Sequence, residues 1–168
     1  DCGLVGKLHI SSHAGRREKR TNDGYRYFRW SGPGAPDFPT GWDDYADTLR
    51  ASGHDATNIL RKKAHESHRL AEPTETADNV PEELHQTTWC TSEAINFVQQ
   101  HQGTDTPWLL SVNPFDPHPD FDPPWEYYRR FDPASLPGPH FRNSDLEHQE
   151  TLSGIYFQNK AQNPKTFP

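Results

Sequence analysis

The chain has 168 residues, a formal net charge of −7 and no methionine. Leu, Ile, Val and Phe make up only about one residue in six, which together with this charge is typical of disordered chains. Disordered chains are poor in aromatic residues, however, and this chain has 5 Trp, 6 Tyr and 9 Phe. We therefore expect one folded region, the central portion of a larger domain that supplies further core strands. The acidic balance argues against a dedicated nucleic-acid binder, and no apolar run approaches the length of a transmembrane helix.

The first predicted elements are a strand and a helix. The apolar run at 2–10 predicts a buried strand, and the polar and then Gly/Pro-rich residues 11–41 predict loop. Thr40 begins the sequence TGWD, which resembles a capping box, and Gly53 is placed to end the helix that follows. The residues of this helix at helical spacing are Trp42, Tyr45, Ala46 and Leu49. Residues 54–80 are weakly patterned and predict loop.

A longer helix is predicted at about 88–102, with Gly103 at its end. Its apolar face consists of Cys90, Ala94, Phe97 and Val98. A buried strand at 107–113 follows, and the order of helix, strand and loop predicts the α/β class. Two short helices are predicted further on, at 123–131 with Pro124 at its start and at about 145–160. Ser144 and Glu147 form a capping-box pattern at the second of these.

The segment SVNPFDPHPDFDPP, residues 111–124, contains five prolines. Proline fixes its own φ and pushes the residue before it to extended geometry, so this segment predicts a stiff loop rather than a helix. His118 has a proline on each side. A stiff loop at the end of a strand is well suited to holding one side chain still, so His118 is a candidate functional residue, although loop histidines often only bond to their neighbours.

Lys7 and His9 are a second candidate pair. They are two residues apart at a strand end and therefore point to the same side, where an ammonium and an imidazole can both donate to an anion. Two solvated polar residues at a strand end are the plain alternative. If Lys7, His9 and His118 serve one anion, the strands ending near His9 and Asn113 should lie in one sheet with their carboxyl ends at the same edge.

Other polar groups are weaker candidates. Four aspartates without EF-hand spacing do not predict a calcium site, and HESH at 65–68 lacks the spacing of a zinc protease motif. The basic run RREKR at 16–20 is short and predicts a solvated loop. The four aspartates are Asp116, Asp120, Asp122 and Asp132. Two cysteines, Cys2 and Cys90, are too few for a disulfide framework but allow one bridge.

Together these motifs resemble the sulfatase family. Sulfatases carry a GKWHLG signature, which reads GKLHIS at 6–11 here. About 100 residues later they carry a helix, an apolar strand and a PHxPF-type loop, which correspond to WCTSEAINFVQQH, PWLLSV and NPFDPHPDFDPP. DGYRYFRW at 23–30 and DDYADTLRASGHD at 43–55 are also similar to the stretch that follows the signature. The resemblance covers most of residues 1–137.

The resemblance implies an alkaline-phosphatase-like α/β sandwich, a central sheet with helices on both faces, rich in loops. It implies a divalent metal, usually Ca²⁺, and a formylglycine nucleophile made from Cys or Ser in Cys/Ser-x-Pro-x-Arg. Lys7 matches the lysine that binds the sulfate and the formylglycine, and His9 matches the histidine that contacts the formylglycine hydroxyl. His118 matches the histidine that binds the sulfate or lies near the leaving oxygen. His9 and His118 are thus expected to be catalytic, and Lys7 and His118 to bind substrate.

The nucleophile motif and the metal ligands of the family are absent from residues 1–168, so we expect a partial sulfatase catalytic domain without metal ligands of its own. The 168 residues alone should be inactive, and the whole protein should hydrolyse a sulfated carbohydrate or an aryl or alkyl sulfate. Two alternatives stay open. One is a phosphonate or phosphate diester hydrolase of the same superfamily, and the other is a non-catalytic module that binds glycans. In each case the partner is a small molecule or glycan, with no nucleic acid and no membrane span.

Overall fold

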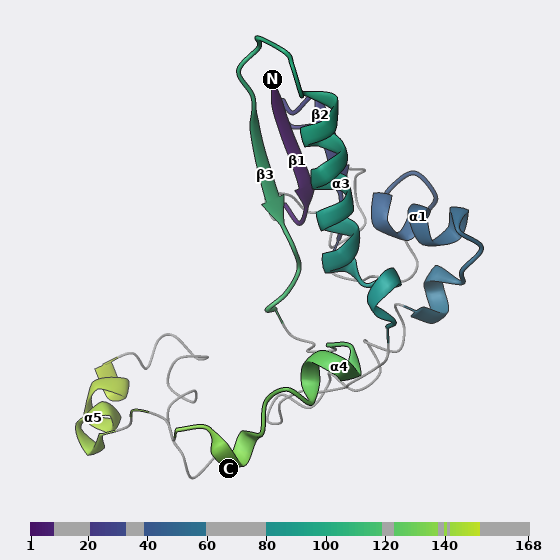
Figure 1. Ribbon diagram of the computed structural model, residues 1–168. Helices are drawn as coiled ribbons and strands as arrows, with labels where there is room; N and C mark the ends of the chain where they lie inside the picture. Colours follow the sequence, from purple (N-terminus) through teal and green to yellow (C-terminus); the bar gives the residue numbers. More distant parts are fainter. Residues whose placement is uncertain are drawn as a thin grey trace.

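The computed structural model describes residues 1–8, 21–32, 39–59, 80–118, 123–137, 140 and 142–151. In these ranges the strands are β1 (Cys2–Gly6), β2 (Tyr27–Trp30) and β3 (Leu109–Asn113). The helices are α1 (Asp44–Ala51), α3 (Gln86–Gln100), α4 (Trp125–Tyr128) and α5 (Asn143–Thr151), with a further helical turn at 56–59. Short 3-10 turns form η2 (Glu82–Leu84) and η3 (Pro133–Ser135). The strands and α3 lie side by side, whereas α5 lies apart from them (Figure 1).

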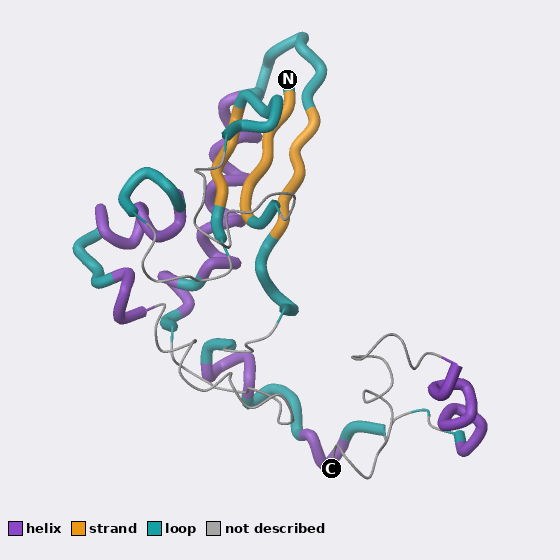
Figure 2. Tube along the Cα trace, turned by 180° about the vertical axis from the view of Figure 1, so that it is seen from behind, coloured by secondary structure: helices purple, strands orange, loops and turns teal. Residues whose placement is uncertain are grey.

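The three strands form a parallel sheet in the order β2-β1-β3 (Figure 2). Gly6 pairs with Trp30 on one side and with Asn113 on the other, so all three carboxyl ends lie at one edge. The predicted α/β class and the shared sheet are confirmed, although β1 ends at Gly6 rather than near His9. His9 itself lies outside the described residues.

Helix α3 packs along one face of the sheet (Figure 1). Its Phe97 is fully buried and lies so close to Gly3 that a Cβ on Gly3 would be 2.7 Å from the Phe97 ring. Around the adjoining end of α3, side chains from β1, α1, α3 and the helical turn at 56–59 form a buried cluster. Its members are Val5, Tyr45, Ala46, Leu49, Ala56, Trp89 and Cys90. Of the predicted apolar positions, Tyr45, Ala46 and Leu49 of α1 and Cys90 and Phe97 of α3 are buried, whereas Trp42 and Ala94 are partly buried and Val98 is exposed.

The cysteines do not pair. Cys2 is exposed and Cys90 is fully buried, and both are free thiols. Burial raises the pKa of the Cys90 thiol to about 12, so this side chain stays protonated and acts as a small apolar core residue.

The predicted starts of α1 and α5 are wrong, and the structure gives the physical reason. Helix α1 is capped by Asp43 rather than Thr40, because the Asp43 carboxylate accepts a hydrogen bond from the Ala46 N–H. Helix α5 begins at Asn143, before the predicted Ser144, and the Asp145 carboxylate accepts from the Arg142 N–H at 2.8 Å. The part of the predicted last helix beyond Thr151 lies outside the described residues.

The predicted strand at 107–113 exists but is not buried. Leu109 and Val112 are 59% and 42% exposed, and β3 is one of the two edge strands of the described sheet. An unbroken apolar run is typical of strands covered on both faces, and here it lies at an edge. In the part of the chain that the structure describes, no helix is long and apolar enough to cross a membrane.

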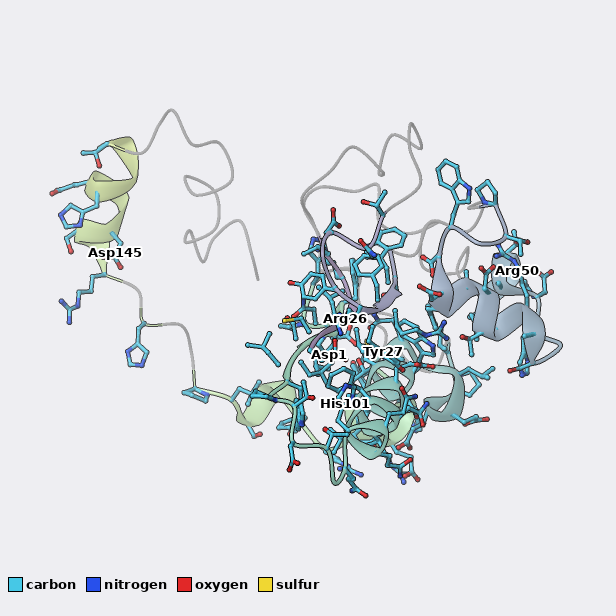
Figure 3. All side chains as sticks on the ribbon, turned by 90° about the horizontal axis from the view of Figure 1, so that it is seen from above. Asp1, Arg26, Tyr27, Arg50, His101 and Asp145 are labelled. Carbon is cyan, nitrogen blue, oxygen red and sulfur yellow. The ribbon has the colours of Figure 1, made fainter. Side chains whose placement is uncertain are left out.

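Polar side-chain contacts connect the sheet to helices α1 and α3. Glu93 on α3 accepts from the Tyr27 hydroxyl at 2.5 Å and from Arg29 at 3.1 Å, and Arg29 also pairs with Asp44 at 3.0 Å. Burial and the hydrogen bond to Glu93 raise the pKa of Tyr27 well above its usual range. At the opposite, amino edge of the sheet, Asp1 pairs with His101 at 3.0 Å (Figure 3).

Replacing Gly6 by alanine should lower the free energy of unfolding by about 3 kcal/mol or more, because the new Cβ overlaps another strand. Gly6 has φ +99, and its Cβ would lie 2.0 Å from the Asn113 carbonyl oxygen. Urea unfolding followed by tryptophan fluorescence measures the loss. Gly24→Ala is the control, because Gly24 has φ +90 but its Cβ would meet nothing within 4 Å. It should cost about 1 kcal/mol, and equal losses in the two variants would contradict the account.

Candidate functional site

The carboxyl edge of the sheet holds Lys7 where β1 ends. The Lys7 N–H donates to the Asn113 carbonyl at 2.8 Å, and the Asn113 side-chain amide donates back to the Lys7 carbonyl at 3.0 Å. These two bonds lock the backbone of Lys7 to the last residue of β3. Lys7 is half-buried, and its side chain extends from a fixed backbone position at this edge.

Lys7 and His118 both contact one aromatic ring, that of Phe115. The Lys7 Nζ lies 4.8 Å from the centre of the Phe115 ring, within the range of a cation–π interaction. The His118 imidazole lies against the same ring, with the two ring centres 4.6 Å apart. The backbone N–H of His118 donates to the backbone carbonyl of Phe115 at 3.1 Å. This bond closes a turn that places the imidazole beside the Phe115 ring. The structure thus brings two of the three predicted site residues together across more than one hundred positions of sequence, while His9 lies outside the described residues.

Gln86 ties this loop to the sheet. Its side-chain oxygen accepts from the Phe115 N–H at 3.0 Å, and its side-chain nitrogen donates to the Ser31 hydroxyl at 2.6 Å. Ser31 is fully buried, and its N–H donates to the Gly6 carbonyl at 3.1 Å. One buried amide therefore connects the ends of β1 and β2 with the loop after β3. Sequence reasoning missed Gln86, because a glutamine in the first turn of a helix carries no signal of its own.

The segment after β2 is held by two aspartates at the start of α1. Asp43 accepts from the Gly32 N–H at 2.8 Å and from the Ala46 N–H at 2.9 Å, and Asp44 accepts from the Trp30 N–H at 2.8 Å. Burial raises the pKa of Asp43 to about 6, although the two backbone donors act in the opposite direction. These contacts place the end of β2 beside the end of β1.

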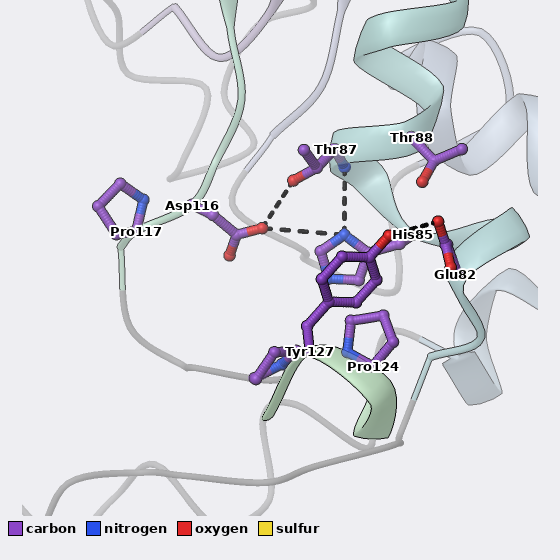
Figure 4. A pocket seen from close by; sticks show the side chains of 9 residues that line it. Glu82, His85, Thr87, Thr88, Asp116, Pro117, Pro124 and Tyr127 are labelled. Atoms are coloured by element: carbon purple, nitrogen blue, oxygen red, sulfur yellow. Dashed lines mark hydrogen bonds and ion pairs between the residues drawn. The ribbon is translucent and has the colours of Figure 1, made fainter. Parts of the chain in front are cut away.

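A pocket of about 450 Å³ lies beside the proline-rich loop, between the start of α3, Pro117 and α4 (Figure 4). Asp116 accepts from the Thr87 hydroxyl at 2.7 Å, and both residues line this pocket. His85, at the start of α3, accepts at Nδ1 from the Thr87 N–H at 3.3 Å. Asp116 and Thr87 thus link the pocket wall formed by the loop to the one formed by α3.

No group of three or more His, Cys, Asp or Glu side chains within the described ranges could hold a metal ion. Asp132 accepts from the Ala134 N–H in a local turn. Asp120 and Asp122, the HESH residues 65–68 and the basic run 16–20 lie outside the described residues. Comparison of the chain with protein-family models, curated proteins and solved structures found no match.

Gln86→Leu should loosen the loop that carries Phe115 and His118. The substitution leaves a buried hydroxyl and a backbone N–H without their partner, so it should cost about 2–3 kcal/mol of stability. Hydrogen exchange of the Phe115 amide should become faster in this variant. Gln99→Leu, at an exposed position of the same helix, is the matched control and should change stability by about 0.5 kcal/mol or less. If the Phe115 amide exchanges at the same rate in both variants, Gln86 does not hold the loop.

Proposed function

We propose that the protein containing this chain is a sulfuric ester hydrolase in which Lys7 and His118 bind the sulfate group. The observation that carries the proposal is the shared contact of Lys7 and His118 with the Phe115 ring, at the carboxyl edge of a parallel sheet. Open α/β sheets bind their ligands at this edge. An ammonium and an imidazole at this edge offer several donors to a tetrahedral anion.

Cleavage of a sulfate ester is helped most by hydrogen-bond donors that do not need to reorganise. When a sulfate ester is cleaved, negative charge develops on the bridging oxygen, and a donor already in place stabilises it most. The Phe115 turn and the Gln86 amide hold the loop, and the prolines around His118 limit its freedom before substrate arrives. In the proposal His118 donates to the leaving oxygen or to the sulfate, Lys7 binds a sulfate oxygen, and His9 contacts the nucleophile.

The proposal also extends to parts that residues 1–168 do not supply. It includes the alkaline-phosphatase-like sandwich with helices on both faces of the sheet, a Ca²⁺ ion and a formylglycine nucleophile. Calcium would neutralise sulfate charge, and its ligands would come from residues other than those described, which contain no suitable group. Cys90 is not the nucleophile in the proposal, because it is buried, its pKa is raised, and no Pro-x-Arg follows it in the required spacing.

His118→Ala in the protein expressed from its complete gene should lower kcat for an aryl sulfate by about 10²-fold or more while leaving the thermal transition unchanged. His54→Ala is the matched control, because His54 is an exposed histidine far along the chain from this loop. The gene should also encode Cys/Ser-x-Pro-x-Arg before residue 1. Unchanged turnover in His118→Ala would refute the catalytic role of His118.

The same assay separates the alternatives. Preferential turnover of a phosphate diester or a phosphonate ester would favour the related hydrolase, since its anion needs similar donors. Absence of the nucleophile motif, with no turnover of any ester, would favour the non-catalytic glycan-binding module.

A further inference from the structure

The pocket beside the proline-rich loop has walls of two kinds (Figure 4). Pro117, Pro123, Pro124 and the ring of Tyr127 give it broad carbon surfaces. Its volume of about 450 Å³ lies within the usual range for small-molecule sites. Flat proline and tyrosine surfaces suit an apolar or aromatic ring, because burying such a ring removes carbon surface from water on both sides.

The charged groups at this pocket are negative. Glu82 accepts from the Tyr127 hydroxyl at 2.7 Å, and Asp116 accepts from the Thr87 hydroxyl at 2.7 Å. Each carboxylate is therefore held in place by one hydrogen bond. No lysine or arginine is among the described residues that line the pocket. Arg130 lies 4.4 Å from the centre of the Tyr127 ring but is not part of the lining.

His85 lies beside one of these carboxylates. Its Nδ1 lies 3.8 Å from the Asp116 carboxylate, which is too long for a hydrogen bond, and it accepts the Thr87 N–H at 3.3 Å instead. The pocket therefore combines apolar walls with two carboxylates and no lysine or arginine among its described lining residues, a combination that disfavours an anionic ligand.

The pocket and the candidate sulfate site share one loop. Asp116 and Pro117 line the pocket, whereas their neighbour Phe115 has a ring that contacts both Lys7 and His118. We propose that the pocket receives the organic part of the sulfate ester, and that this part is an apolar, ring-bearing group without negative charge. This inference rests on the proposed function. It selects aryl and cycloalkyl sulfates over glycans that carry several sulfates or carboxylates.

Binding of unreactive probes tests the pocket independently of catalysis. Benzyl alcohol, benzylamine and benzoate have similar shapes but are neutral, cationic and anionic. In NMR titrations of the labelled protein from the complete gene, the first two should shift the Tyr127 ring signals saturably. Benzoate should bind about tenfold more weakly, because two carboxylates face it. Equal or tighter binding of benzoate would overturn the inference.

Variants at Tyr127 and at the two carboxylates test whether the probes bind in this pocket. Tyr127→Ala should weaken benzyl alcohol binding at least fivefold, whereas Tyr127→Phe keeps the ring and should bind as the parent does. In Glu82→Gln combined with Asp116→Asn, the discrimination against benzoate should largely disappear. Unaltered binding in Tyr127→Ala, or unaltered discrimination in the double variant, would overturn the assignment of the pocket.

Turnover connects the pocket to the ester. The parent protein should have a kcat/KM for phenyl sulfate about tenfold higher than for 3-carboxyphenyl sulfate, and the double variant should reduce this ratio. If the protein hydrolyses both esters equally, the inference fails while the proposed function stands. If it hydrolyses no sulfate ester, the proposed function and the role of the pocket in it both fail, whatever the probes show.

Discussion

The backbones of Gly6 and Asn113 approach so closely at the carboxyl end of the sheet that a Cβ on Gly6 would lie 2.0 Å from the Asn113 carbonyl oxygen. Only glycine fits this approach, and its φ of +99 turns the chain out of β1 directly afterwards. Lys7 and Asn113 then exchange two hydrogen bonds. Because the loop with Phe115 and His118 begins at the same point, this single close contact brings together residues that are remote in sequence.

The edge of the sheet combines a buried support with accessible donors. Gln86 and Asp43 are almost fully buried and satisfy backbone and side-chain groups at the ends of the strands. Lys7 is half-buried and His118 is exposed, so both can reach a ligand. Phe115 connects the buried support to the accessible donors, because its N–H donates to Gln86 and its ring contacts both Lys7 and His118. Donors that are already held in place need little reorganisation when a ligand binds. This suits the proposed hydrolysis of a sulfate ester.

The sequence predicted what depends on local pattern. Helical spacing found Tyr45, Ala46 and Leu49 in the core, and Gly53 ends α1 with φ +81. The predicted helix boundaries were wrong where a side chain outside the apolar pattern caps the helix. His85 caps α3, which therefore begins at Gln86 rather than at residue 88. The exposure of β3 and the bridge made by Gln86 could not be predicted, because both depend on which elements become neighbours in space. Lys7 and His118 became candidates through their local settings, a strand end and a proline-rich loop, and through the resemblance of their motifs to a known family.

Titration with inorganic sulfate tests most directly whether Lys7 and His118 form one anion site. In the isotope-labelled protein, sulfate should shift the Lys7 Cε and His118 ring signals saturably and with one dissociation constant, while the exposed His54 stays unchanged. Lys7→Met should weaken the His118 response by about tenfold, because an ammonium close to the anion is lost. Arg26→Gln removes an 80% exposed cation at the amino edge and should leave the response unchanged. A His118 response that is the same in Lys7→Met as in the parent would contradict the shared site.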